Sequence, residues 1–125
     1  MKKIIFALCL LVSVSVSSKE KDCEEGAESL SMVEACLLTE NEKPVNDAYD
    51  KLVKSMTNQE SIGALKQSQD DWIKFRNSTC NYLAISKSEN GNSDRTAINV
   101  DCQTDFNKAR VKILNGYAKS AKANK

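Results

Sequence analysis

The side chains with the widest chemical range in this chain are five cysteines. Cys9 stands inside an apolar run near the start, and four more follow: Cys23, Cys36, Cys80 and Cys102. A thiolate can be a nucleophile or a metal ligand, and two thiols can form a disulfide. No two cysteines have Cys-x-x-Cys spacing, and the chain has no histidine to complete a zinc site. Cys9 should be lost with the N-terminal signal peptide described below, so four cysteines remain. An even number of cysteines in a small exported chain favours two disulfides, so we expect no metal and no cofactor.

Four cysteines allow three disulfide pairings, and the sequence alone leaves all three open. We prefer the most local pairing, which joins Cys23 to Cys36 and Cys80 to Cys102. Each bridge should raise the free energy of unfolding by about 3 kcal/mol, which matters for a core this small.

The sequence offers few residues that could act as a general acid, a general base or a nucleophile. Without histidine there is no ordinary catalytic triad and no convenient general base near neutral pH. The adjacent carboxylates Asp70 and Asp71 would point in different directions on a helix, which is typical of a solvated surface. Oxidised cysteines offer no thiolate nucleophile. We therefore predict that the chain is not an enzyme.

One predicted helix face carries polar side chains among apolar ones. Seven residues fall within about 80° of arc on this face: Ile62, Leu65, Gln69, Trp72, Arg76, Cys80 and Leu83. Because five of them are apolar or cysteine, the face should be buried, and its polar groups then need partners. The candidate carboxylates for Arg76 are Asp22, Glu34 and Asp105. We prefer a structural role for Gln69 and Arg76 in fixing helix register, and the alternative is a binding cleft.

Apolar residues spaced by three and four predict three helices, and the alternation typical of strands is missing from the mature chain. The helices should span residues 29–56, 57–86 and a segment from about 93 towards the C-terminus. Short connections make consecutive helices antiparallel neighbours. We predict an all-α fold, a small antiparallel up-down-up bundle of three helices with two disulfides, and all four cysteines near one end.

Three details of these helices are open to direct comparison with a structure. Pro44 must kink or restart the first helix. Thr57 and Glu60 have the spacing of a capping box that opens the second helix. The third helix should carry its apolar residues on one face: Ile98, Cys102, Phe106, Ala109, Ile113 and Tyr117.

The first eighteen residues predict a signal peptide. Two lysines precede an apolar run at residues 4–16, and we expect cleavage after Ser18. The run is too short for a comfortable membrane span. Cys9 lies in the middle of the run, so it should leave with the peptide and carry no lipid. The mature chain is then a single periplasmic or secreted domain over residues 19–125, with no membrane contact after cleavage.

Charge is nearly balanced overall and unevenly spread. Without Lys2 and Lys3 of the signal peptide, 16 basic and 17 acidic residues remain, and a net charge near −1 indicates neither nucleic-acid nor membrane-surface binding. Residues 22–42 hold seven acidic and no basic side chains, and residues 108–125 hold six basic and no acidic ones. The plain interpretation is a solvated acidic helix end with a frayed basic tail. The sharper one makes the acidic stretch a docking surface for a basic partner.

The sequence resembles the N-terminal-domain family of the lysozyme inhibitor LprI, which consists of exported bacterial four-cysteine helical proteins. The resemblance covers nearly the whole mature chain and rests on an ordered set of residues: Asp22 with Cys23, Cys36, Asn46, Tyr49, Gln69, Trp72, Arg76, Cys80, Gly91, Ser93, Cys102, Arg110 and Leu114. Three places depart from the family pattern. Asn77 stands where an acidic residue is usual, Asn107 stands where threonine is usual, and residues 29–34 replace a more regular motif.

The resemblance implies a binding protein that inhibits a lysozyme-type muramidase. The partner is then a lysozyme or another envelope protein, and the sequence sets no oligomeric state. The candidate contact is the loop of Lys87, Ser88, Glu89 and Asn90, with Lys87 available to meet carboxylates in a sugar-binding cleft. Such a loop is also the default connection between helices. Two alternatives remain, a periplasmic structural or housekeeping protein and a toxin-immunity protein with an unknown protein partner.

Overall fold

The computed structural model of the chain describes residues 22–89 and 91–123. It confirms an all-α fold with three long helices: α2 (Leu30–Ser55), α3 (Gln59–Lys87) and α4 (Asn92–Ala123). One helical turn at residues 22–24 precedes them. The predicted signal peptide, with Cys9 and the expected cleavage site, lies outside the described residues.

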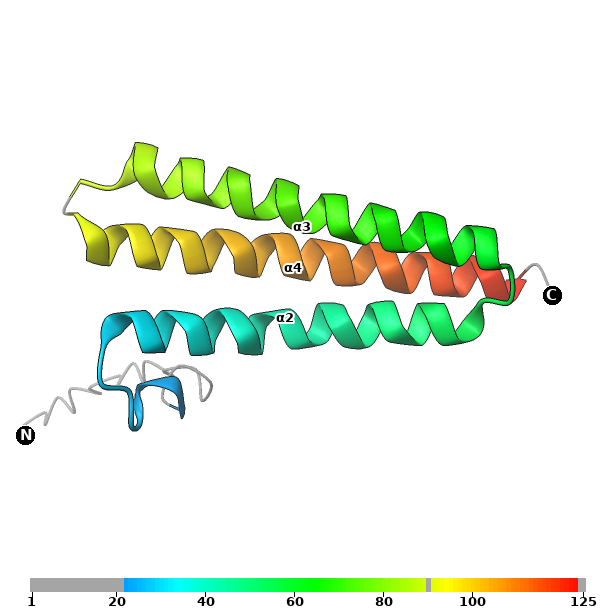
Figure 1. Cartoon of the computed structure of the whole chain (residues 1–125), viewed down its shortest axis with the longest axis horizontal. Coiled ribbons are helices and arrows are strands. Elements are labelled where there is room, and N and C mark those ends of the chain that lie inside the picture. The colour runs from blue at the N-terminus through cyan, green and yellow to red at the C-terminus, as the bar shows by residue number, and fades with distance from the viewer. Residues whose placement is uncertain (1–21, 90, 124–125) are drawn as a thin grey trace, which may run out of the picture.

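The three helices run lengthwise beside one another, and α4 lies between α2 and α3 in the view of Figure 1. α3 runs antiparallel to the other two, so the predicted up-down-up order is confirmed. α4 packs along both α2 and α3, whereas α2 and α3 pack less closely on each other. The inward side chains of α4 therefore meet residues from both neighbours.

Both predicted disulfides are present. Cys23 bonds to Cys36 and Cys80 bonds to Cys102, with 5.6 Å between the Cα atoms of each pair. The first bridge ties the leading turn to α2, and the second joins α3 to α4. Both lie towards the end of the bundle where α2 and α4 begin and α3 ends. We call this half the cystine end and define it as residues 22–40 and 80–105.

The start of α3 corrects the expected capping box. The N-cap residue is Asn58, whose Oδ1 accepts a hydrogen bond from the backbone nitrogen of Ser61 at 2.8 Å. Thr57 is therefore not the cap, and the prediction was wrong by one residue. Asparagine is at least as good an N-cap as threonine, so local energetics agree with the observed choice.

α2 continues through Pro44 without a break, so a restart at this residue is wrong. Proline removes one backbone hydrogen bond from a helix interior and crowds the preceding turn. Pro44 is exposed, whereas Val45, Ala48 and Leu52 on the opposite side of α2 are buried. Burial of that face holds the helix together across the proline.

The apolar core is small and lies towards the end opposite the cystines. Val45, Ala48 and Leu52 of α2 pack with Leu114 of α4, and Leu114 is fully buried. Partly buried side chains from the three helices and the α2–α3 connection close over this cluster: Tyr49, Met56, Leu65, Trp72, Val111 and Ala118. The middle of the bundle is filled differently, by polar side chains.

The expected apolar face of α4 is not its buried face. Ile113 and Tyr117 are 44% and 52% exposed. The residues that point inward are instead mostly polar: Gln103, Asn107, Arg110 and Leu114. This difference has a physical reason, because Arg76 of α3 and Arg110 of α4 are both buried between the helices, and buried cations need amide and hydroxyl partners. The basic segment after Tyr117 is helical as far as Ala123.

Candidate functional site

Arg76 lies in the interior of the bundle with 2% of its surface exposed. Its guanidinium donates to one side-chain oxygen from each helix: Oε1 of Glu42 at 2.5 Å, Oδ1 of Asn77 at 2.8 Å and Oδ1 of Asn107 at 2.8 Å. The planar fork of arginine suits this arrangement because its N–H groups spread towards several acceptors. Arg76 therefore ties α2, α3 and α4 together.

The carboxylate on Arg76 corrects the sequence-based candidates, which were Asp22, Glu34 and Asp105. Glu34 lies two turns before Glu42 on α2 and accepts hydrogen bonds from two side chains of α4 instead. Asp105 is exposed and pairs with a lysine of its own helix at 3.8 Å. Asp22 is also exposed. Arg76 lies at the level of the middle of α2, next to Glu42. The helix pattern in the sequence did not show at which level along α2 its partner would stand.

Arg110 is the second buried cation, and it shares the indole ring of Trp72 with Arg76. Its Nε donates to Oε1 of Gln69 at 2.9 Å, and its Nη2 donates to Oγ of Ser68 at 3.3 Å. The guanidinium carbons of Arg76 and Arg110 lie 5.1 and 5.4 Å from the centre of the Trp72 ring. Burial lowers the pKa of Arg110, and the nearby Tyr117 opposes that shift. The electron-rich faces of Trp72 compensate part of this desolvation.

Amide side chains complete the layer on the α2 side. Asn107 uses its oxygen for Arg76 and its Nδ2 for the backbone oxygen of Asn41 at 2.9 Å. Asn41 in turn donates to Oγ1 of Thr104 at 2.8 Å. Within the described part of the chain, no buried side-chain nitrogen or oxygen lacks a hydrogen-bond partner. We call this arrangement the polar layer and define it as Glu42, Gln69, Trp72, Arg76, Asn107 and Arg110.

The polar layer supports the structural interpretation of Gln69 and Arg76. Its donors and acceptors are already engaged with one another, so a ligand would have to displace existing hydrogen bonds. Sequence reasoning identified the α3 half but missed Glu42 and Asn107. The spacing of Gln103, Asn107, Arg110 and Leu114 was the available signal, because steps of four, three and four residues mark one face of a helix.

The remaining motif residues, Asn46 and Tyr49, stand on α2. Asn46 is exposed, and nothing in the structure explains its identity. Tyr49 is half-buried and packs on the same apolar cluster as Trp72 of the polar layer. Tyr49 therefore contributes to the core.

The candidate loop is short and lies at the tip of the cystine end. Lys87 is the last residue of α3 and is exposed, as is Glu89. Ser88 accepts a hydrogen bond from Nε of Arg95 at 3.2 Å, which ties the loop to α4. Asn90 lies outside the described residues. Gly91 has a φ of +88°, a left-handed conformation that favours glycine, and α4 starts immediately after it.

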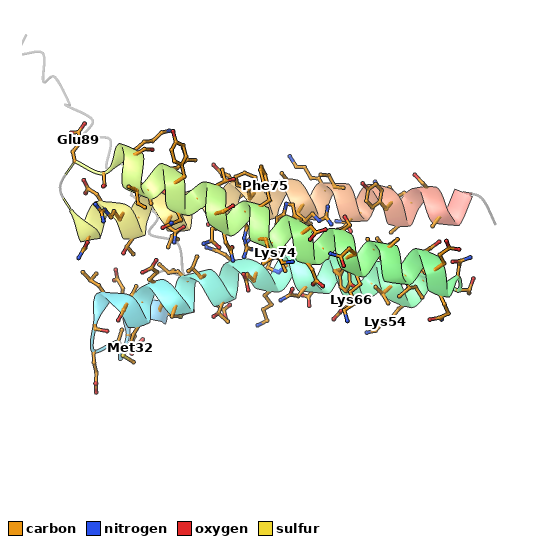
Figure 2. All side chains as sticks on the ribbon, turned by 45° about the horizontal axis from the view of Figure 1, so that its top comes forward. Met32, Lys54, Lys66, Lys74, Phe75 and Glu89 are labelled. Carbon is orange, nitrogen blue, oxygen red and sulfur yellow. A yellow bond between two sulfur atoms is a disulfide. The ribbon has the colours of Figure 1, made fainter. Side chains whose placement is uncertain are left out.

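Charge divides the molecule along its length. The cystine end holds ten acidic and two basic residues, a formal charge of −8. Residues 41–79 and 106–123 hold six acidic and eleven basic residues, a formal charge of +5. Figure 2 shows Glu89 at the tip of the cystine end and Lys54 and Lys66 in the other half. A field of this kind attracts cationic partners to one end of the bundle.

A metal site or a membrane span would each need its own arrangement of side chains. Among residues 22–89 and 91–123, no group of three or more histidine, cysteine or acidic side chains is placed to hold a metal ion. No helix in the same ranges is both long and apolar enough to cross a membrane.

Comparison with known proteins agrees with this architecture. A family model described as lysozyme inhibitor LprI matches residues 19–114, a stretch that contains α2, α3 and most of α4. The chain belongs to the LprI lysozyme-inhibitor family. No curated protein and no solved structure matches the chain. The match confirms the resemblance seen in the cysteines and the Gln/Trp/Arg residues.

The structure of this LprI-family chain also places two of the three departures noted in the sequence. Asn77 and Asn107 both lie on Arg76, and each gives it an amide oxygen. An acidic side chain at position 77 would place a second carboxylate on the same guanidinium. In this chain Glu42 is the carboxylate of the Arg76 ion pair, and neutral amides supply the other contacts.

Proposed function

We propose that this chain is an exported inhibitor that binds a lysozyme-type muramidase and obstructs its sugar-binding cleft. The observation that carries the proposal is the family match over residues 19–114, which spans the scaffold and both disulfides. The family is one of inhibitors, which favours a binding protein over an enzyme.

The scaffold has the properties that an inhibitor needs. Two cystines fix the cystine end, and the polar layer fixes the middle of the bundle, before any partner arrives. A preorganised binder loses less conformational entropy on association, so more of its contact energy appears as affinity. The disulfides favour an oxidising compartment. With removal of residues 1–18, we propose that the protein acts in the periplasm or outside the cell.

The tip of the cystine end is the part that we propose approaches the cleft. Muramidases cleave glycosidic bonds with a pair of carboxyl groups in the cleft. Lys87 is exposed and stands among acidic residues, with Arg95 as the other cation of this half. On this chain, a lysine is surrounded by acidic residues. On a basic muramidase, the catalytic carboxyl groups are surrounded by cations, so the two charge patterns are complementary. Lys87 is therefore placed to meet the cleft, with Ser88 and Glu89 beside it.

A cell-wall lysis assay tests the proposal. The oxidised protein of residues 19–125 is titrated against a c-type and a g-type lysozyme, and clearing of a cell-wall suspension is followed by turbidity. We expect lysis by at least one lysozyme to fall in proportion to the added protein. The same chain, reduced and alkylated, is the control and should not inhibit.

The contrary outcome is equally concrete. If neither lysozyme is inhibited at a large excess of folded protein, and calorimetry detects no complex, the inhibitor function is wrong. An envelope protein that then co-purifies with the chain would favour the housekeeping or immunity alternative.

A further inference from the structure

A groove runs along the outside of α3 and α4, next to the Cys80–Cys102 bridge. Its volume is about 450 Å³, and its apolar lining comes from Leu83, Ile98, Cys102 and Phe106. These α4 side chains belong to the face that sequence reasoning assigned to the core. In the structure the face closes only against α3 and leaves its outer side open.

An aromatic pair marks the inner end of this groove. The rings of Phe75 and Phe106 meet edge to face, with centroids 5.7 Å apart and an interplanar angle of 74°. Phe75 is 57% exposed, a large fraction for phenylalanine. Figure 2 places it where α3 runs against α4. Exposed aromatic side chains of this kind commonly anchor protein interfaces.

The rim of the groove is charged. Asp101 and Asp105 stand on the α4 side, and Lys87 stands at the end nearest the loop. Both aspartates are exposed, and all the lining residues except Phe106 belong to the cystine end, whose formal charge is −8. An apolar floor with an acidic rim suits a partner that presents an apolar side chain surrounded by cations.

We infer that the α3–α4 groove is the docking surface for a cationic target protein, with Phe75 as its apolar anchor and Asp101 and Asp105 as its acidic rim. The inference rests on the proposed function and adds to it the surface and the charge of the target. Lys87, next to the groove, then reaches the target cleft while the groove packs against the cleft's edge.

Charge also indicates whether the groove binds a different protein or a second copy of this chain. A symmetric dimer through this groove would bring the same patch of both copies together. Asp101 and Asp105 would then face an equally acidic surface, and like charges across an interface are unfavourable. A cationic partner experiences the opposite force, so the groove fits a different protein.

Binding of the intact oxidised protein to a cationic c-type lysozyme, and to the same lysozyme with its lysines acetylated, tests this inference. The groove variants are Phe75→Ala and Asp101→Lys. Their matched controls are Tyr117→Ala, which truncates another exposed aromatic residue, and Asp50→Lys, which makes the same charge change in the other half. Circular dichroism melting establishes that each variant is folded.

We expect Phe75→Ala to weaken binding by about tenfold or more, because buried anchors near an interface centre carry most of its energy. Asp101→Lys should weaken binding by a similar factor at low salt, because it replaces an attraction to the cationic target with a repulsion. The controls should stay within about twofold, and acetylation of the lysozyme should weaken binding by the unmodified chain. Groove variants that bind like the controls overturn the assignment of the groove.

Two other outcomes are distinguishable from that one. If the unmodified chain neither binds nor inhibits lysozyme, the proposed function fails and the docking surface falls with it. If the chain alone sediments as a dimer that Phe75→Ala dissociates, a second copy covers the groove and the inference is overturned.

Discussion

The polar layer and the α3–α4 groove both involve the helices α3 and α4 and use their side chains in opposite ways. In the layer, Arg76 is 2% exposed and its fork is engaged with oxygens from three helices. In the groove, Phe75 is 57% exposed and touches a single aromatic partner. Buried and saturated groups hold a fold, whereas exposed apolar groups with charged neighbours remain available to a partner. The recognisable motif of this family therefore need not be its binding site.

The largest expected effect comes from removing the centre of the layer. Arg76→Ala leaves Glu42 and two amide oxygens without their donor in a partly buried setting. We expect the free energy of unfolding to fall by about 3–5 kcal/mol, measured by urea denaturation with circular dichroism. Arg95→Ala, on an exposed arginine, is the matched control and should cost less than about 0.5 kcal/mol. If Arg76→Ala unfolds at the normal free energy but no longer binds its target, the binding site lies in the polar layer.

Loss of the α3–α4 disulfide should come next. Replacing Cys80 and Cys102 together with serine opens a 22-residue loop and puts a hydroxyl at the fully buried position 80. We expect a loss of about 3 kcal/mol in the free energy of unfolding, seen as a lower melting temperature. The matching replacement of Cys23 and Cys36 opens a 13-residue loop and should cost less. If replacing Cys23 and Cys36 lowers the free energy of unfolding more than replacing Cys80 and Cys102 does, this prediction is wrong and the first disulfide is the more stabilising one.

A smaller effect tests the observed start of α3. Asn58→Ala removes the side-chain acceptor for the backbone nitrogen of Ser61. The free energy of unfolding should fall by about 1 kcal/mol. Thr57→Ala is the neighbouring control and should change it by less than about 0.5 kcal/mol. The reverse order of the two variants would restore the capping box that the sequence suggested.

The smallest effect on stability is expected at the tip of the cystine end. Lys87→Ala removes an exposed side chain, so the free energy of unfolding should change by less than about 0.5 kcal/mol. Inhibition of lysozyme should nevertheless weaken, because the proposed contact with cleft carboxylates is lost. A variant that melts normally and inhibits normally would exclude Lys87 from the contact surface.

Features that depend on spacing along a single helix could be predicted from the sequence. The three helices and the burial of Gln69 and Arg76 depend on periodicity and on short connections, and the structure confirms them. The sequence left three disulfide pairings open, and the structure has the most local one, which was preferred. The predicted signal peptide and the loop contact depend on residues or partners that the structure does not describe, and they stay predictions.

Features that depend on how one helix is rotated against another could not be predicted in this way. The apolar face from Ile98 to Tyr117 was assigned to the core, and the structure turns most of it towards α3 and the outside. Hydrophobicity favoured that face, but Arg76 needs an amide acceptor and Arg110 has to reach Gln69, so α4 turns Asn107 and Arg110 inward. The same rotation decides that Arg76 meets Glu42 and that the groove stays open.

The most direct test of the claim that the polar layer holds the fold while the groove binds the target is an NMR titration. In it, the isotope-labelled protein is titrated with unlabelled c-type lysozyme. The ring signals of Phe75 and Phe106 and the indole N–H of Trp72 report on the groove and on the polar layer in one experiment. We predict that the two phenylalanine rings shift or broaden as complex forms while the Trp72 indole signal stays in place. A shift of Trp72 with unchanged phenylalanine signals would contradict the assignment of the groove and make the polar layer the binding site.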